Sequence, residues 1–108
     1  MSTVLDRILA AKREEVTAAK AERPSFAGEL PPSDRDFRGA LRQSGISLIA
    51  EIKRASPSKG DILPDAKAVD LSTLYEQAGA RAISVLTDGP YFKGSLEDLS
   101  AVHQDVRI

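Results

Sequence analysis

The sequence predicts an α/β fold built from parallel β-α-β units, and three observations support this prediction. From residue 47 onward, short apolar runs alternate with helical segments, and loops containing Gly or Pro separate them. The first two apolar runs begin about 35 residues apart, which is the length of one β-α-β unit. The 42% of apolar residues, together with the 7 glycines, is close to the globular average, so 108 residues suffice for the core of one domain.

Residues 1–45 are predicted to form a helical extension ahead of the β-α-β units, which occupy residues 46–108. An amphipathic helix is expected over residues 4–20, because one narrow apolar stripe recurs there at helical spacing. The stripe consists of Leu5, Leu9 and Val16. Thr3 is the predicted N-cap, and Asp6 three residues later suits both the capping position and the helix dipole.

A linker and a second, short helix follow. Residues 21–33 contain three prolines and a glycine with little periodicity, which is typical of a linker. Ser33 is the predicted N-cap of the second helix, with Asp36 at its third helical position and Gly45 as its C-terminal stop. The apolar face of this helix consists of Phe37, Ala40 and Leu41.

The first β-α-β unit has a strand over residues 47–53, a helix over 68–78 and a second strand over 82–87. Gly79 is the predicted C-terminal stop of the helix. The apolar residues at helical spacing are Leu71, Leu74, Tyr75 and Ala78. Since crossovers between parallel strands are almost always right-handed, we expect that hand here.

Another helix and the start of a third strand complete the pattern. Ser95 is the predicted cap of this helix, Asp98 completes a capping box, and residues 106–108 begin the third strand. The apolar positions of the helix are Leu96, Leu99 and Val102. Parallel sheets need covered faces and paired edges, so we expect the chain to be a fragment of a larger α/β domain.

Composition excludes several function classes. The 15 Lys and Arg balance 16 Asp and Glu, so no basic field directs the chain to nucleic acid or anionic lipid. Without cysteine there is no disulfide and no thiolate metal site, and His103 as the one histidine disfavours a His-based site. No apolar stretch approaches the roughly 20 residues that span a bilayer, and residues 1–20 do not resemble a signal peptide. We expect a cytoplasmic protein.

The first strand carries the strongest candidates for chemistry. Alternation places Ile49, Glu51 and Lys53 on one face and an entirely apolar set on the other. If helices cover the apolar face, Glu51 and Lys53 point away from it at the carboxyl end of the strand, where α/β proteins bind ligands. An exposed edge strand with a charged pair explains the pattern equally well, so both interpretations stay open.

Two loops lie at the same end of the predicted sheet. The loop Arg54–Gly60 offers hydroxyls and, with Lys53, three cations, which suits either an anion site or an ordinary polar loop. The loop Asp88–Gly94 presents Tyr91 and Phe92, which either pack in the core or stack on an aromatic substrate. His103 lies late in a helix, where a positive charge interacts favourably with the terminal carbonyls. We therefore prefer this structural role for His103 over a catalytic one.

Four motifs carry a resemblance to a known family: Leu48–Gly60, Tyr75–Ala80, Ser84–Asp88 and Tyr91–Ser95. Together they resemble the indole-3-glycerol phosphate synthase family of tryptophan biosynthesis, and the first motif is highly specific. The helices ahead of residue 46 also resemble the extension of that family. The resemblance implies that the chain is the N-terminal part of a (β/α)₈ barrel, with the helical extension, the first two βα units and the start of strand three.

The resemblance also implies an activity and a set of site residues. The family decarboxylates and ring-closes 1-(2-carboxyphenylamino)-1-deoxyribulose 5-phosphate to indole-3-glycerol phosphate, with loss of carbon dioxide and water and without metal or organic cofactor. Glu51 matches the first-strand glutamate of the active site, and Lys53 the anion-binding and catalytic lysine. Ser56 and Pro57 match substrate contacts of the first loop, and Phe92 an aromatic residue of the anthranilate pocket.

The resemblance implies that the general acid and the general base of the family lie beyond residue 108. We therefore expect the remainder of the barrel to be needed for a complete active site, and the fragment alone to be inactive. Two alternatives stay open. Another phosphate-binding barrel would use Lys53 as a Schiff-base lysine. A non-catalytic interaction module would instead pair its open sheet edge with another chain.

Overall fold

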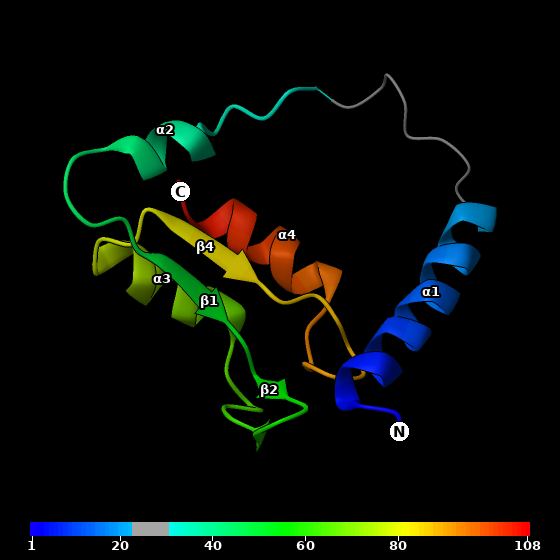
Figure 1. Ribbon diagram of the computed structural model, residues 1–108. Coiled ribbons are helices and arrows are strands. Elements are labelled where there is room, and N and C mark those ends of the chain that lie inside the picture. The colour runs from blue at the N-terminus through cyan, green and yellow to red at the C-terminus, as the bar shows by residue number, and fades with distance from the viewer. Residues whose placement is uncertain (23–30) are drawn as a thin grey trace. The chain divides into compact units, whose positions relative to one another are not determined.

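The computed structural model describes residues 1–22 and 31–108 (Figure 1). The chain divides into two compact units, Met1–Ser33 and Asp34–Ile108. The linker predicted over residues 21–33 falls mostly on residues 23–30, which lie outside the described residues. Within the two described ranges, no helix is long and apolar enough to cross a membrane.

The first unit contains the helix α1 (Val4–Glu22), which runs two residues beyond the predicted end. Thr3 and Asp6 form the expected capping box, because the Thr3 hydroxyl accepts from the Asp6 amide at 3.1 Å and the Asp6 carboxylate accepts from the Thr3 amide at 2.8 Å. These hydrogen bonds to Thr3, the backbone one above all, lower the pKa of Asp6. The predicted start of the helix is confirmed.

The second unit begins with the short helix α2 (Phe37–Arg42), whose N-cap is Asp36 and not Ser33. The Asp36 carboxylate accepts from the Gly39 amide at 2.9 Å. The predicted N-cap was therefore wrong by one turn, because Asp caps a helix as well as Ser does and the sequence offers both. Gly45 has a left-handed φ of 88° but lies beyond the actual C-cap of the helix.

The sheet at the centre of this unit pairs β1 (Ile49–Ile52) in parallel with β4 (Ala82–Val85). Residue 51 stands opposite residue 84 in the register. Both strands are shorter than predicted, because only four residues of each take part in the ladder. The parallel pairing itself confirms the β-α-β interpretation.

A small hairpin follows β1 and was not predicted. It pairs β2 (Ala55–Ser56) antiparallel to β3 (Gly60–Asp61). Two-residue strands leave no detectable alternation of apolar and polar residues, so the sequence suggested only a polar loop here. Gly60 has a φ of 66°, which a side chain at that position would disfavour.

Two helices, α3 (Ala68–Gln77) and α4 (Leu96–Asp105), pack side by side on one face of the sheet (Figure 1). Buried residues from β1, from both helices and from the segment after α4 form the core, and they are Ile52, Ala68, Val102 and Val106. Leu71 and Tyr75 pack against this core, whereas Leu74 is exposed. The second unit therefore has an α/β architecture with helices covering the apolar face of β1.

Both predicted caps in this region are confirmed. Gly79 follows the C-cap of α3 with a left-handed φ of 95°. The Ser95 hydroxyl accepts from the Asp98 amide at 3.1 Å at the start of α4. The third strand predicted over residues 106–108 is not found in the described residues. Val106 is extended and buried, but no neighbouring strand pairs with it or with the two residues after it.

Arg81 fixes the amino ends of both strands to the segment that follows α2. Its guanidinium donates to the carbonyls of Gln43 and Ser44, at 2.9 and 2.6 Å. It also donates to the Ser47 hydroxyl at 2.7 Å. Thus α2 belongs to the amino end of the sheet, and the carboxyl end is left to the loops that follow β1 and β4 (Figure 1).

The loop between β4 and α4 depends on Gly94. A Cβ atom on this residue would lie 1.8 Å from the carbonyl oxygen of Leu86, whereas a Cβ on Gly89 would meet nothing closer than 3.8 Å. We expect Gly94→Ala to lower the free energy of unfolding by about 3 kcal/mol or more, because backbone must move to relieve the clash. Gly89→Ala in the same loop is the matched control, and urea denaturation should show a change under about 1 kcal/mol. Equal effects of the two substitutions would contradict the geometry.

Candidate functional site

Glu51 and Lys53 lie together at the carboxyl end of β1, on the face that the helices do not cover. Ala50 and Ile52 are buried on the opposite face, as the alternation predicted. The Lys53 ammonium lies 3.3 Å from Oε1 of Glu51, and both side chains are partly open to solvent, at 36% and 43%. An ion pair in this position leaves the ammonium accessible to a ligand from solution.

Phe92 joins this pair from the loop between β4 and α4. The Lys53 ammonium lies 5.7 Å from the centre of its ring, which is within the range of a cation–π contact. Of the five residues predicted for the site, the fold therefore brings Lys53, Glu51 and Phe92 into one cluster. Phe92 lies about forty residues along the chain from Glu51 and Lys53.

Ser84 is a member of this cluster that sequence reasoning missed. Its hydroxyl donates to Oε2 of Glu51 at 2.9 Å. The signal available in the sequence was a hydroxyl between the apolar residues Ile83 and Val85 of the second strand. Only the parallel register, which sets Ser84 opposite Glu51, shows that this hydroxyl reaches a charged partner.

Ser56 and Pro57 lie in the hairpin that follows β1. Ser56 is buried, and its hydroxyl accepts from the Lys59 amide at 3.1 Å and lies 3.4 Å from the Ser58 hydroxyl. Pro57 is exposed at the turn. The hydrogen bonds of Ser56 found in the described chain stay within the hairpin, so its role toward a substrate, like that of Pro57, remains a prediction.

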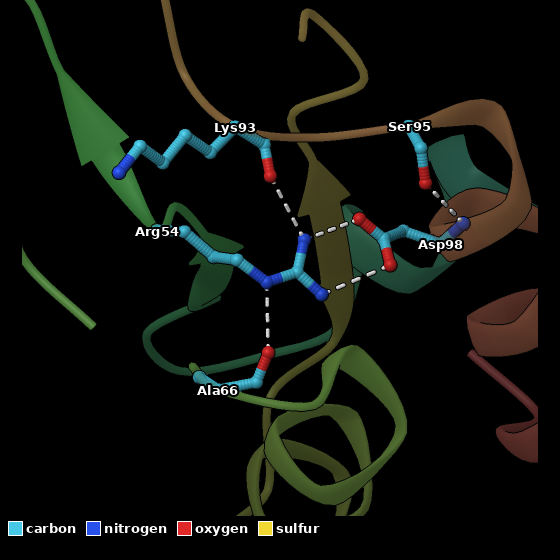
Figure 2. A network of polar contacts seen from close by, with 5 residues as sticks. All are labelled: Arg54, Ala66, Lys93, Ser95 and Asp98. Carbon is cyan, nitrogen blue, oxygen red and sulfur yellow. Dashed lines mark hydrogen bonds and ion pairs between the residues drawn. The ribbon is translucent and has the colours of Figure 1, made fainter. Parts of the chain in front are cut away.

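Arg54, counted among three cations of an anion site, is engaged in the protein itself. Figure 2 shows its guanidinium between Ala66, Lys93 and Asp98. Nε donates to the Ala66 carbonyl at 2.7 Å, and Nη1 donates to the Lys93 carbonyl at 3.1 Å. Both terminal nitrogens bind the Asp98 carboxylate, one of them at 3.0 Å. Arg54 is therefore not a free cation for a ligand, and that part of the anion-site interpretation was wrong.

The Arg54–Asp98 ion pair is mostly buried, with side chains 15% and 17% exposed. Its hydrogen bonds raise the pKa of Arg54 and, against the effect of burial, lower the pKa of Asp98 below its usual value. Hydrogen bonds to Ser95 at the helix start lower the pKa of Asp98 further. The carboxylate that caps α4 thus also anchors the loop after β1.

Lys93 connects the two loops a second time. Its ammonium donates to the Asp61 carboxylate at 2.5 Å across the surface, while its carbonyl accepts from Arg54. Its φ of 53° lies in the left-handed region, which is uncommon for a residue with a side chain. The residue next to Phe92 is therefore held from both sides.

The remaining candidates lie elsewhere. His103 occupies the last turn of α4, as predicted. No three His, Asp or Glu side chains gather closely enough to hold a metal ion among the residues that the structure describes. The chemistry that the cluster offers is an ammonium for an anion, a carboxylate beside it and an aromatic face.

Comparison with known proteins identifies the family. A family model described as indole-3-glycerol phosphate synthase matches residues 5–108. The chain belongs to the indole-3-glycerol phosphate synthase family. The resemblance drawn from the sequence motifs is therefore confirmed.

Several curated relatives carry the name indole-3-glycerol phosphate synthase. The relative from Azoarcus sp. (strain BH72) is 49% identical over an alignment of 109 positions, and the match covers 94% of this chain. The relative from Mycobacterium ulcerans (strain Agy99) is 48% identical over 99% of this chain, and that from Oceanobacillus iheyensis is 48% identical over 98%. The chain spans about 41% of the length of each of these synthases.

The Arg54–Asp98 pair makes the stability of this synthase-family chain depend on pH. Because the folded state lowers the pKa of Asp98, the contribution of the carboxylate is complete above the unfolded pKa of about 3.9 and is lost as the pH falls through the folded pKa. At pH 7, Asp98→Asn should lower the free energy of unfolding by about 2–4 kcal/mol, since it leaves Arg54 without its charged partner.

This difference between wild type and Asp98→Asn should shrink between about pH 4 and pH 2, as measured by urea denaturation at a series of pH values. Asp70→Asn is the matched control, because Asp70 is an exposed residue in the first turn of α3. A difference that stays constant down to pH 2 would mean that the charge of Asp98 contributes nothing.

Proposed function

We propose that this chain supplies the first part of the active site of an indole-3-glycerol phosphate synthase. The complete protein would convert 1-(2-carboxyphenylamino)-1-deoxyribulose 5-phosphate to indole-3-glycerol phosphate with loss of carbon dioxide and water, as a carboxy-lyase of the cytoplasm. The observation that carries the proposal is the cluster of Lys53, Glu51 and Phe92 at the carboxyl end of β1. Those are the side chains that the family resemblance assigns to the site.

The proposed fold of the complete protein is a (β/α)₈ barrel. Residues 1–45 would be its helical extension, and residues 46–108 would form its first two βα units. The parallel pair of β1 and β4 with helices on one face supports this proposal, because in such barrels the loops at the carboxyl ends of the strands build the active site.

Each residue of the cluster has a role that its surroundings support. Lys53 binds the anionic groups of the substrate through its accessible ammonium, and Glu51 orients that ammonium and stabilises positive charge that develops on the substrate. The ring of Phe92 flanks the anthranilate ring. Ser56 and Pro57 contact the substrate from the hairpin loop. The general acid and base come from the remainder of the barrel, and the reaction requires no cofactor.

A chimera tests the activity directly. In it, this chain replaces the matching segment of the Azoarcus relative, which is 41% of the length of that protein. We expect the chimera to form indole-3-glycerol phosphate, detected by indole absorbance. The same replacement in the Mycobacterium ulcerans relative guards against a misfolded product. Two chimeras that melt cooperatively and show no activity would refute the proposal, and a covalent borohydride adduct at Lys53 with a carbonyl substrate would favour Schiff-base chemistry instead.

Lys53→Ala in the chimera should lower kcat/KM by at least about tenfold, which corresponds to roughly 1.4 kcal/mol of transition-state stabilisation. Lys53→Arg should recover only part of the loss, because the guanidinium keeps the charge but lacks the compact geometry of the ammonium. Arg38→Ala removes an exposed cation at the other end of the sheet and serves as the control. Steady-state kinetics on variants shown to be folded at the assay temperature make the comparison, and activity of Lys53→Ala within about twofold of wild type would contradict the role.

A further inference from the structure

Glu51 divides its carboxylate between two partners. Oε1 lies 3.3 Å from the Lys53 ammonium, and Oε2 accepts a hydrogen bond from the Ser84 hydroxyl at 2.9 Å. The two partners come from different segments, since Lys53 follows β1 and Ser84 lies within β4. The orientation of the carboxylate is therefore set from two sides.

The sheet places Ser84 in this position. Ile83 and Val85 pack against the core beneath the helices, so Ser84 between them faces the other side of the sheet. In the parallel register it stands opposite Glu51. Neighbouring strands lie about 5 Å apart, so side chains that are opposite on one face reach each other without displacing the backbone.

We propose that Ser84 is a positioning residue that holds one oxygen of Glu51 and thereby keeps the carboxylate from closing both oxygens onto Lys53. This inference rests on the proposed function, because its consequence is that the Lys53 ammonium stays available to an anionic substrate. Without Ser84, Oε2 turns toward the ammonium, which has three N–H donors and can accommodate both oxygens. Substrate then has to compete with a closed ion pair.

The forces involved are of comparable size, so one hydroxyl suffices to bias the arrangement. Glu51 and Lys53 are both partly exposed, so solvent weakens the attraction between their charges. The bond from Ser84 ends on a carboxylate, which strengthens it relative to a bond between neutral groups. The ring of Phe92 contacts the ammonium and leaves donor capacity free for substrate.

Kinetics of the chimera give the first test. Ser84→Ala should raise KM by about threefold to tenfold, because substrate must displace Glu51 from the Lys53 ammonium. It should change kcat by less than about twofold, because the ammonium is still available once substrate has bound. Ser84→Thr keeps the hydroxyl and should restore KM. Ser100→Ala, at an exposed position in α4, is the matched control. A Ser84→Ala chimera with unchanged KM, or one that Ser84→Thr fails to rescue, would overturn the inference.

The second test does not depend on activity. Limiting acetic anhydride acetylates exposed lysines, and mass spectrometry gives the rate at each. Acetic anhydride reacts with the neutral amine, so an ammonium held by both oxygens of a carboxylate must leave them and lose a proton before the nitrogen attacks. Ser84→Ala should therefore slow the acetylation of Lys53 by about threefold. Lys59 and Lys67, both exposed, serve as internal references.

Glu51→Gln decides whether the effect passes through the carboxylate. In that background, Ser84→Ala should leave the rate at Lys53 unchanged, because no anionic oxygen remains to close onto the ammonium. An equal slowing in both backgrounds, or none in either, would refute the role of Ser84. A folded but inactive chimera would refute the proposed function alone, since the acetylation rates still decide whether Ser84 positions Glu51.

Discussion

The bidentate ion pair between Arg54 and Asp98 is the contact on which the carboxyl end of this sheet depends. Arg54 stands where the chain leaves β1, and Asp98 stands in the first turn of α4. The same guanidinium binds the carbonyls of Ala66 and Lys93, so one side chain joins the loop before α3, the loop after β4 and the start of α4. Planar guanidinium geometry suits this task, because it offers five donors in fixed directions.

Adjacent residues divide structural and chemical roles at this point. The Arg54 guanidinium forms a mostly buried ion pair with Asp98. The Lys53 ammonium, in contrast, is partly exposed and lies beside Glu51 and Phe92. The chain belongs to the indole-3-glycerol phosphate synthase family. The side chains proposed to bind substrate are held in place by hydrogen bonds from neighbouring residues. Phe92 is an example, since the carbonyl of the next residue is held by Arg54.

The two faces of the sheet divide in the same way between a structural role and a chemical role. On one face, Ile52 and the buried residues of the helices exclude water and fix the strands. On the other face, Glu51 and Ser84 lie opposite each other and share a hydrogen bond. A rigid apolar layer behind the strands is what allows partly exposed polar groups in front of them to keep a defined geometry.

The sequence by itself determined the parallel β-α-β organisation, most of the helix caps, the face on which Glu51 and Lys53 lie and the family. These follow from local rules, since periodicity, capping residues and strand alternation act within a few residues. The N-cap of α2 was misplaced because Ser33 and Asp36 are equally suitable locally. The third strand failed to form in the described residues because an extended segment becomes a strand only when another strand pairs with it.

Only the tertiary structure decided the partners of the charges. Periodicity left Arg54 as one of three cations in a polar loop, and its pairing with Asp98 spans 44 positions that no local rule relates. The hydrogen bond from Ser84 to Glu51 likewise depends on the register of two strands. Hydrogen bonds and ion pairs between distant segments require directions and distances within a few tenths of an ångström. Packing of the whole unit sets those distances, and the order of residues along the chain does not.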